Sequence, residues 1–178
     1  MRNLIILILL ILLSIDSIAQ ESKFVEHINS YQNALKNGDL NKAVDEIKKC
    51  IDEYAEKVNN TDTTYALLIG RLAYIFTELE QYENALSLYE QVFEIFKKSF
   101  GEERPEVATS LNNLASIYAK IGQYEKALHL QEHSLKIYKK AFGEENLAVA
   151  ISLDNLASFY ADMSQYTKAF PYCILANK

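Results

Sequence analysis

The chain has 178 residues, with 24 acidic and 18 basic side chains, so its formal net charge is −6. An acidic chain without a cluster of Lys and Arg is poorly suited to bind nucleic acid or an anionic membrane surface. The sequence is rich in Ala, Leu, Tyr, Glu and Lys, and it has five Gly, two Pro and no Trp. This composition is typical of a helical protein of about one domain.

The first nineteen residues have the layout of a secretory signal peptide. A short basic start, residues 1–3, precedes an unbroken apolar run from Leu4 to Leu13, and small residues occupy positions Ser17 and Ala19. The apolar run is much shorter than the ~20 residues that a membrane-spanning helix needs. We therefore predict a signal peptide over 1–19, cleavage after Ala19, and export to the periplasm, the envelope or the outside of the cell. A retained membrane anchor is the alternative. After cleavage we expect no contact with a membrane.

The rest of the chain repeats itself with a period of 42 residues. The pair Leu72-Ala73 recurs as Leu114-Ala115 and as Leu156-Ala157, and no gap is needed to align the copies. A weaker copy precedes them. The other aligned positions are Phe76, Tyr118 and Tyr160; Tyr82, Tyr124 and Tyr166; Ala85, Ala127 and Ala169; and Leu86, Leu128 and Phe170. A fixed period of this length predicts a repeat architecture.

Each copy has the pattern of two amphipathic helices joined by a tight corner. In the copy over 105–146, apolar residues mark one helical face up to Tyr118, the corner follows around Gly122, and a second apolar face runs from Tyr124 to Phe142. Glycine or a short polar residue at the corner allows the tight turn, and we expect Gly143 to be a C-terminal cap. A first-turn proline is tolerated at Pro105.

A single hairpin cannot bury its apolar face alone, so neighbouring hairpins must stack. The prediction is an all-α, right-handed solenoid of about four helical hairpins. They are a degenerate hairpin over 20–62, two full hairpins over 63–104 and 105–146, and an incomplete one over 147–178.

The pattern Leu-Ala-x-x-Tyr, then Gly-x-Tyr, then Ala-Leu resembles the tetratricopeptide repeat (TPR). The longer unit, opened by the segment from Pro105 to Ala115, resembles the kinesin light chain-like subclass. This resemblance implies a non-catalytic scaffold for protein–protein interaction. It also implies that the first helix of each hairpin lines a concave groove, and that the groove takes an extended peptide or a partner helix.

The same resemblance assigns the groove positions. They are Leu67, Gly70, Arg71, Tyr74 and Glu78 in the second hairpin; Thr109, Asn112, Asn113, Ser116 and Lys120 in the third; and Ile151, Asp154, Asn155, Ser158 and Asp162 in the fourth.

Asn113 and Asn155 share one register and could grip a peptide backbone, because an Asn side chain offers both donors and an acceptor. The alternative is that they hydrogen-bond within or between hairpins. Asp154 and Asp162 suggest a ligand with basic groups.

We expect no catalytic residue, metal site or cofactor. His129, Glu132 and His133 spell a zinc-peptidase motif, but the repeat register places both histidines on the solvated side of a second helix. Cys50 falls in a small core slot, and Cys173 lies nearly three repeats away, so we predict two unpaired thiols. His27, near the start, belongs to no recognisable pattern.

Two other functions remain open. The chain could be the N-terminal recruiting or sensory module of a larger effector, such as a caspase-like CHAT peptidase or a signalling protein. It could also be a self-associating structural array, joined through the incomplete last hairpin, which lacks a polar capping helix.

Overall fold

The computed structural model describes residues 23–56 and 62–176, so the predicted signal peptide lies outside the described residues. The chain forms two compact units, one up to Asn59 and one from Asn60 onward. The described residues form helices and turns and no strands. Among them, no helix is both long enough and apolar enough to cross a membrane.

The first unit contains a helical stretch over residues 23–36 and helix α2, Leu40–Ala55. The Asp39 side chain caps α2 by accepting a hydrogen bond from the backbone N–H of Lys42. The buried side chains of this unit include Tyr31, Ala34, Ala43, Ile47 and Cys50.

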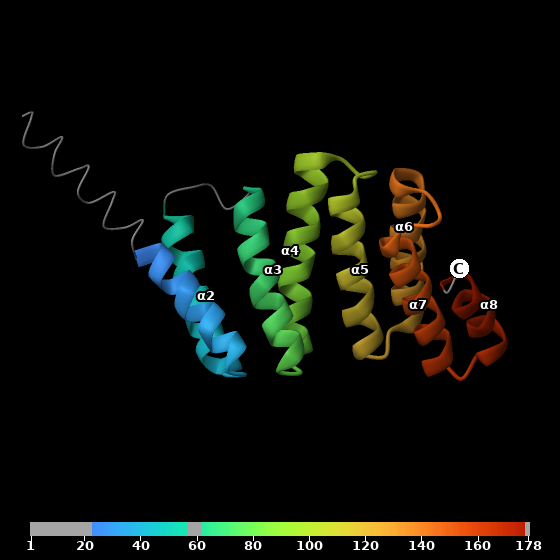
Figure 1. Cartoon of the computed structure of the whole chain (residues 1–178), viewed down its shortest axis with the longest axis horizontal. Coiled ribbons are helices and arrows are strands. Elements are labelled where there is room, and N and C mark those ends of the chain that lie inside the picture. The colour runs from blue at the N-terminus through green and yellow to red at the C-terminus, as the bar shows by residue number, and fades with distance from the viewer. Residues whose placement is uncertain (1–22, 57–61, 177–178) are drawn as a thin grey trace, which may run out of the picture. The chain divides into compact units, whose positions relative to one another are not determined.

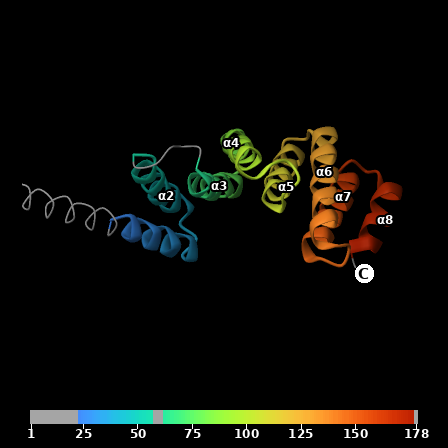
Figure 2. The ribbon, with the colours of Figure 1, turned by 90° about the horizontal axis from the view of Figure 1, so that it is seen from above.

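The second unit is a stack of helices in chain order, as Figures 1 and 2 show. Each helix from α3 to α8 packs against the next, and α5 also contacts α7, the first helix of the following hairpin. This arrangement confirms the predicted all-α repeat fold. The helices are α3 (Thr63–Glu78), α4 (Tyr82–Phe100), α5 (Pro105–Lys120), α6 (Tyr124–Phe142), α7 (Leu147–Asp162) and α8 (Tyr166–Ala176).

Small residues hold the paired helices close together. Ala115 on α5 and Ala127 on α6 are fully buried in one apolar cluster, and Phe159 of α7 completes that cluster. The preceding cluster is built in the same way from Ala73, Ala85, Tyr89, Leu114 and Ile117. Each cluster therefore takes residues from three consecutive helices, which is why one hairpin depends on the next.

The helix ends agree with the sequence pattern. Pro105 is the first residue of α5, and Gly143 caps α6 with a φ of 82°. On α8 the aromatic side chains Tyr166 and Phe170 are exposed, whereas their equivalents on α4 and α6 are partly buried against the following hairpin.

The corners between paired helices place one residue in the left-handed region at every period. These residues are Gly38, Glu80, Gly122 and Ser164, with φ values of 73°, 57°, 77° and 59°. The residue after each of them donates its N–H back to the ending helix, as in the 2.8 Å bond from Gln123 to the Tyr118 carbonyl. Glu80 is neither glycine nor a short polar residue. The backbone geometry there matches the other corners, although Glu80 has a Cβ atom, which the left-handed region disfavours.

This corner geometry predicts opposite effects for two substitutions. Glu80→Gly should raise the free energy of unfolding by about 0.5–1 kcal/mol, because glycine adopts positive φ without a Cβ penalty. Gly122→Ala should lower it by about 1 kcal/mol through backbone strain. A Cβ at Gly122 would meet nothing within 4 Å, so a clash cannot explain the loss. Urea unfolding followed by circular dichroism measures both. A destabilised Glu80→Gly variant would contradict the argument.

Candidate functional site

The predicted groove residues lie on one helical face of α3, α5 and α7, which we call the first-helix face. On α3 the side chains of Leu67 and Tyr74 are 57% and 51% exposed. On α5 and α7 the equivalent positions are exposed or half-buried. The face consists of Leu67, Gly70, Arg71, Tyr74, Glu78, Thr109, Asn112, Asn113, Ser116, Lys120, Ile151, Asp154, Asn155, Ser158 and Asp162.

A hydrogen-bonded centre on this face is built around Asn112. Its side-chain oxygen Oδ1 accepts a 2.9 Å hydrogen bond from Nδ2 of Asn155 and another 2.9 Å bond from Nε2 of Gln131. These bonds use both lone pairs of the Asn112 oxygen, so its amide group can act toward a ligand only as a donor. Asn155 keeps its side-chain oxygen and one N–H. The centre therefore offers donors on α5 beside an acceptor on α7.

The structure gives the two predicted asparagines different roles. Asn155 forms a hydrogen bond to the neighbouring hairpin, which was the alternative to ligand binding. Its partner is Asn112 and not Asn113, the residue at the same repeat position as Asn155. The Asn113 side chain is half-buried and forms no hydrogen bond with any described residue. Asn113 therefore keeps its full capacity to bind a ligand.

Gln131 of α6 was missed by the sequence analysis. Its side chain is fully buried, and besides Asn112 it reaches the Ser152 carbonyl at 3.4 Å. Its Oε1 and the Ser152 hydroxyl are buried and have no partner among the described residues. The sequence does contain a signal for it: Gln131 is polar, whereas the same repeat position in the preceding hairpin is occupied by Tyr89, which is buried.

The hydroxyl groups on the α5 part of the face bind protein atoms. Thr109 Oγ1 donates to the Pro105 carbonyl at 3.0 Å and lies 2.7 Å from the Tyr138 hydroxyl. Burial raises the pKa of Tyr138. Ser116 donates to the Asn112 carbonyl at 3.1 Å. The groups on α5 that can still bind a ligand are thus the amides of Asn112 and Asn113 and the ammonium of Lys120.

Charges on the face are exposed and unevenly distributed. Arg71, Lys120, Asp154 and Asp162 are exposed, and none of them forms an ion pair with a described residue. The sixteen residues of α7 include these two aspartates and no Lys or Arg. The α7 part of the face is therefore anionic.

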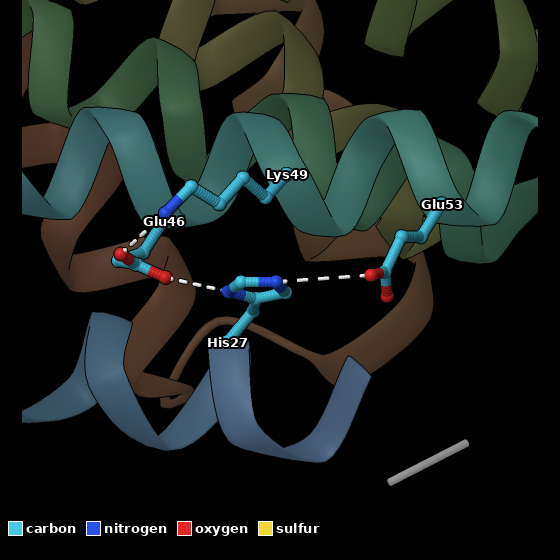
Figure 3. A network of polar contacts seen from close by, with 4 residues as sticks. All are labelled: His27, Glu46, Lys49 and Glu53. Atoms are coloured by element: carbon cyan, nitrogen blue, oxygen red, sulfur yellow. Dashed lines mark hydrogen bonds and ion pairs between the residues drawn. The ribbon is translucent and has the colours of Figure 1, made fainter. Parts of the chain in front are cut away.

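His27 has close partners on α2, which no sequence pattern indicated. Figure 3 shows its ring between two carboxylates of α2, with Nδ1 2.7 Å from Glu46 Oε2 and Nε2 3.7 Å from Glu53 Oε1. Lys49 donates to the other Glu46 oxygen at 2.9 Å. The hydrogen bonds from Lys49 and then His27 lower the pKa of Glu46, although burial opposes the shift. This cluster ties residues 23–36 to α2.

His129, His133 and Cys50 have the exposure that the sequence predicts for them. His129 and His133 are exposed on α6. Cys50 is buried and no disulfide joins it to the exposed Cys173; desolvation, followed by nearby carboxylates, raises the pKa of Cys50 to about 11. Among the described residues, no three His, Cys, Asp or Glu side chains are placed to hold a metal ion.

Comparison with known proteins identifies the family. The family model of the tetratricopeptide repeat matches residues 62–140 and, overlapping them, 113–172. The chain is a tetratricopeptide repeat protein. No curated protein sequence matches it.

Solved structures with a similar fold include kinesin light chain-like repeat proteins. BtubC (BKLC) from P. vanneervenii is 23% identical with a TM-score of 0.75, over 83% of this chain and 59% of that one. A putative kinesin light chain from P. anserina is 23% identical with a TM-score of 0.73, over 86% and 73%. The Rap conjugation regulator of plasmid pLS20, in complex with the Phr* peptide, is 15% identical with a TM-score of 0.79, over 92% and 44%. These similarities establish the fold. The chain spans less than two thirds of BtubC and of the Rap protein.

The Glu46 cluster predicts an acid-sensitive first unit. Because the pKa of Glu46 is lowered in the folded state, its contribution to stability is present above the pKa of the unfolded chain and is lost as pH falls through the folded value. Glu46→Gln should cost roughly 1–2 kcal/mol at pH 6 and progressively less towards pH 3.

Hydrogen exchange of the α2 backbone amides, corrected for intrinsic exchange rates, measures this local change in stability. Asp52→Asn removes an exposed carboxylate from the same helix and is the matched control. Equal protection of α2 in the wild-type protein and in Glu46→Gln at pH 6 would contradict the assignment.

Proposed function

We propose that this TPR protein is a non-catalytic scaffold that holds an extended peptide segment of a partner protein on the first-helix face. The observation that carries the proposal is the Asn112 centre. The side-chain oxygen of Asn112 is held by two hydrogen bonds, one from the fully buried Gln131 and one from Asn155. A ligand thus meets amide groups whose orientation is set before it binds, which lowers the entropic cost of binding.

The chemistry of the centre suits a peptide backbone. An extended chain presents C=O and N–H groups in alternation, and its unpaired groups bind best to side chains that supply the complementary donors and acceptors. Asn112 and Asn113 supply N–H donors, and the Asn155 oxygen supplies an acceptor. Such contacts hold a chain without reading its sequence.

Relatives in fold agree with this function at a coarser level. The Rap regulator of pLS20 was solved with the Phr* peptide, and another Rap protein was solved with Competence and Sporulation Factor. Those ligands belong to those proteins. For this chain they support a protein or peptide partner as the ligand class.

A matched pair of substitutions tests the face. Ser158→Arg adds bulk to the first-helix face on α7, and Ser87→Arg makes the same change at an exposed position of α4 outside the face. Peptides selected on the wild-type protein from a random 12-residue phage library should lose at least about tenfold in affinity for Ser158→Arg and keep it for Ser87→Arg, because only the first blocks the docking surface. Fluorescence polarisation measures both. Selected peptides that bind Ser158→Arg unchanged would refute the proposed face.

We also propose that the protein acts after export, on the basis of the signal-peptide layout of residues 1–19. Immunoblots of cell fractions with antibody against residues 20–178 should detect the native protein in the envelope or secreted fraction. A band much larger than these residues would favour the recruiting module of a larger effector. A band confined to the cytoplasm would contradict export.

A further inference from the structure

Large apolar side chains lie at both ends of the first-helix face, and polar ones lie between them. Leu67 and Tyr74 on α3 are about half exposed, and Ile151 on α7 is 47% exposed. In the repeat register, Thr109 of α5 lies between Leu67 and Ile151, and Ser116 is the α5 equivalent of Tyr74. The face therefore presents an apolar patch, a hydrogen-bonding centre and a second apolar patch.

The distance between these patches limits the ligand. Of the first helices, α5 and α7 contact each other, and helices in contact lie ~8–10 Å apart, so α3 and α7, with α5 between them, are separated by at least roughly 20 Å. An extended chain advances ~3.3 Å per residue, so about six residues cover that span. Side chains six apart point to the same side of an extended chain, because the alternation has a period of two.

The two patches differ in charge. The α7 patch is next to Asp154 and Asp162, and α7 has no basic residue to offset them. On α3 the charges of Arg71 and Glu78 offset each other, and between the patches Lys120 lies in the same register as Glu78 and Asp162. A cationic group on the ligand is therefore favoured at the α7 end only.

From this arrangement we infer that the ligand is an extended peptide segment with two large apolar side chains about six residues apart and with Lys or Arg next to the one that lies on α7. The inference rests on the proposed docking face and specifies what that face recognises. The apolar ends select side chains, the aspartates select the basic end, and the Asn112 centre holds the backbone between them.

A designed peptide tests the spacing. The probe is a fluorescent 12-residue peptide of Ser and Thr with leucines at the third and ninth positions and lysines at the tenth and eleventh, together with its reversed sequence. One of the two should bind the full chain at least about tenfold more tightly than versions with leucines three apart or with serine in place of either leucine. Equal binding of these versions, or no binding of any of them at millimolar concentration, would overturn the inference.

Substitutions in the protein test the patches. Leu67→Thr and Ile151→Thr each introduce the residue that α5 already has at the same register, so the fold should tolerate both. Each should weaken the designed peptide about tenfold. Ile174→Thr removes an exposed apolar side chain from α8, outside the face, and should leave binding unchanged. Loss of binding in all three variants, or in none, would contradict the assignment of the patches.

A charge-matched pair tests the basic end. Asp154→Asn with Asp162→Asn should reduce both the affinity for the designed peptide and its salt dependence. Glu94→Gln with Glu132→Gln removes the same number of charges from exposed positions of second helices and should change neither. Unchanged salt dependence in the aspartate variant would refute the basic end of the ligand.

The library peptides separate this inference from the proposed function. If they lose affinity for Ser158→Arg but show no pair of apolar residues at this spacing, the docking face stands and the inference fails. If they bind Ser158→Arg as well as the wild-type protein, both fail. Enrichment of the spaced pair with a basic neighbour, together with loss of binding to Ser158→Arg, supports both.

Discussion

The positions of the helices in the second unit depend on close packing at paired alanines. Ala73 and Ala85 belong to one buried cluster, and Ala115 and Ala127 to the next, all of them fully buried. Because alanine has no atoms beyond Cβ, the two helices of a hairpin approach closely, and large residues such as Ile117 fill the space beside them. Protein interiors are packed too densely to absorb a larger side chain without movement of the helices. A displaced α5 would carry Asn112 and Asn113 with it, so the geometry of the exposed face depends on these small residues.

The interface between the third and fourth hairpins combines this packing with a buried polar residue, Gln131. One period earlier, between the second and third hairpins, the buried Tyr89 occupies the equivalent position. A buried polar atom without a partner costs roughly 1–3 kcal/mol, and Gln131 Oε1 has none among the described residues. Tyrosine would fill the slot without burying that amide. What Gln131 adds is a hydrogen bond that orients Asn112, so some stability of the stack is exchanged for order on the first-helix face.

The sequence was sufficient for the repeat fold because its period is constant and its signals reinforce one another. Small residues and apolar faces recur at the same positions, so each copy supports the assignment of the others. Glu80 escaped the corner rule because the hairpin geometry determines the backbone there and overrides the preference of the side chain.

The contacts of the site could not be read in this way. Register aligns Asn113 with Asn155, whereas the hydrogen bond joins Asn155 to Asn112, one position away. Which of two adjacent residues meets the next helix depends on how the helices cross, and the period does not contain that information. The hydrogen bonds of Gln131 with Asn112 and of His27 with Glu46 also link residues nineteen apart in the chain across a helix–helix interface. Only a three-dimensional arrangement brings such residues together.

The hydrogen bond between Asn155 and Asn112 limits which polar groups remain for a bound chain, and so limits what the polar centre can contribute to the binding energy. The amides of Asn112 and Asn113 and the Asn155 oxygen would form hydrogen bonds that replace bonds to water, each with a net gain of about 1 kcal/mol. Burying a large apolar side chain at either end of the face contributes roughly 1.5–3 kcal/mol. Most of the affinity should then come from the patches at Leu67 and Ile151. The polar centre would mainly fix the register of the ligand, because a chain shifted by one residue reverses the sides on which its donors and acceptors point.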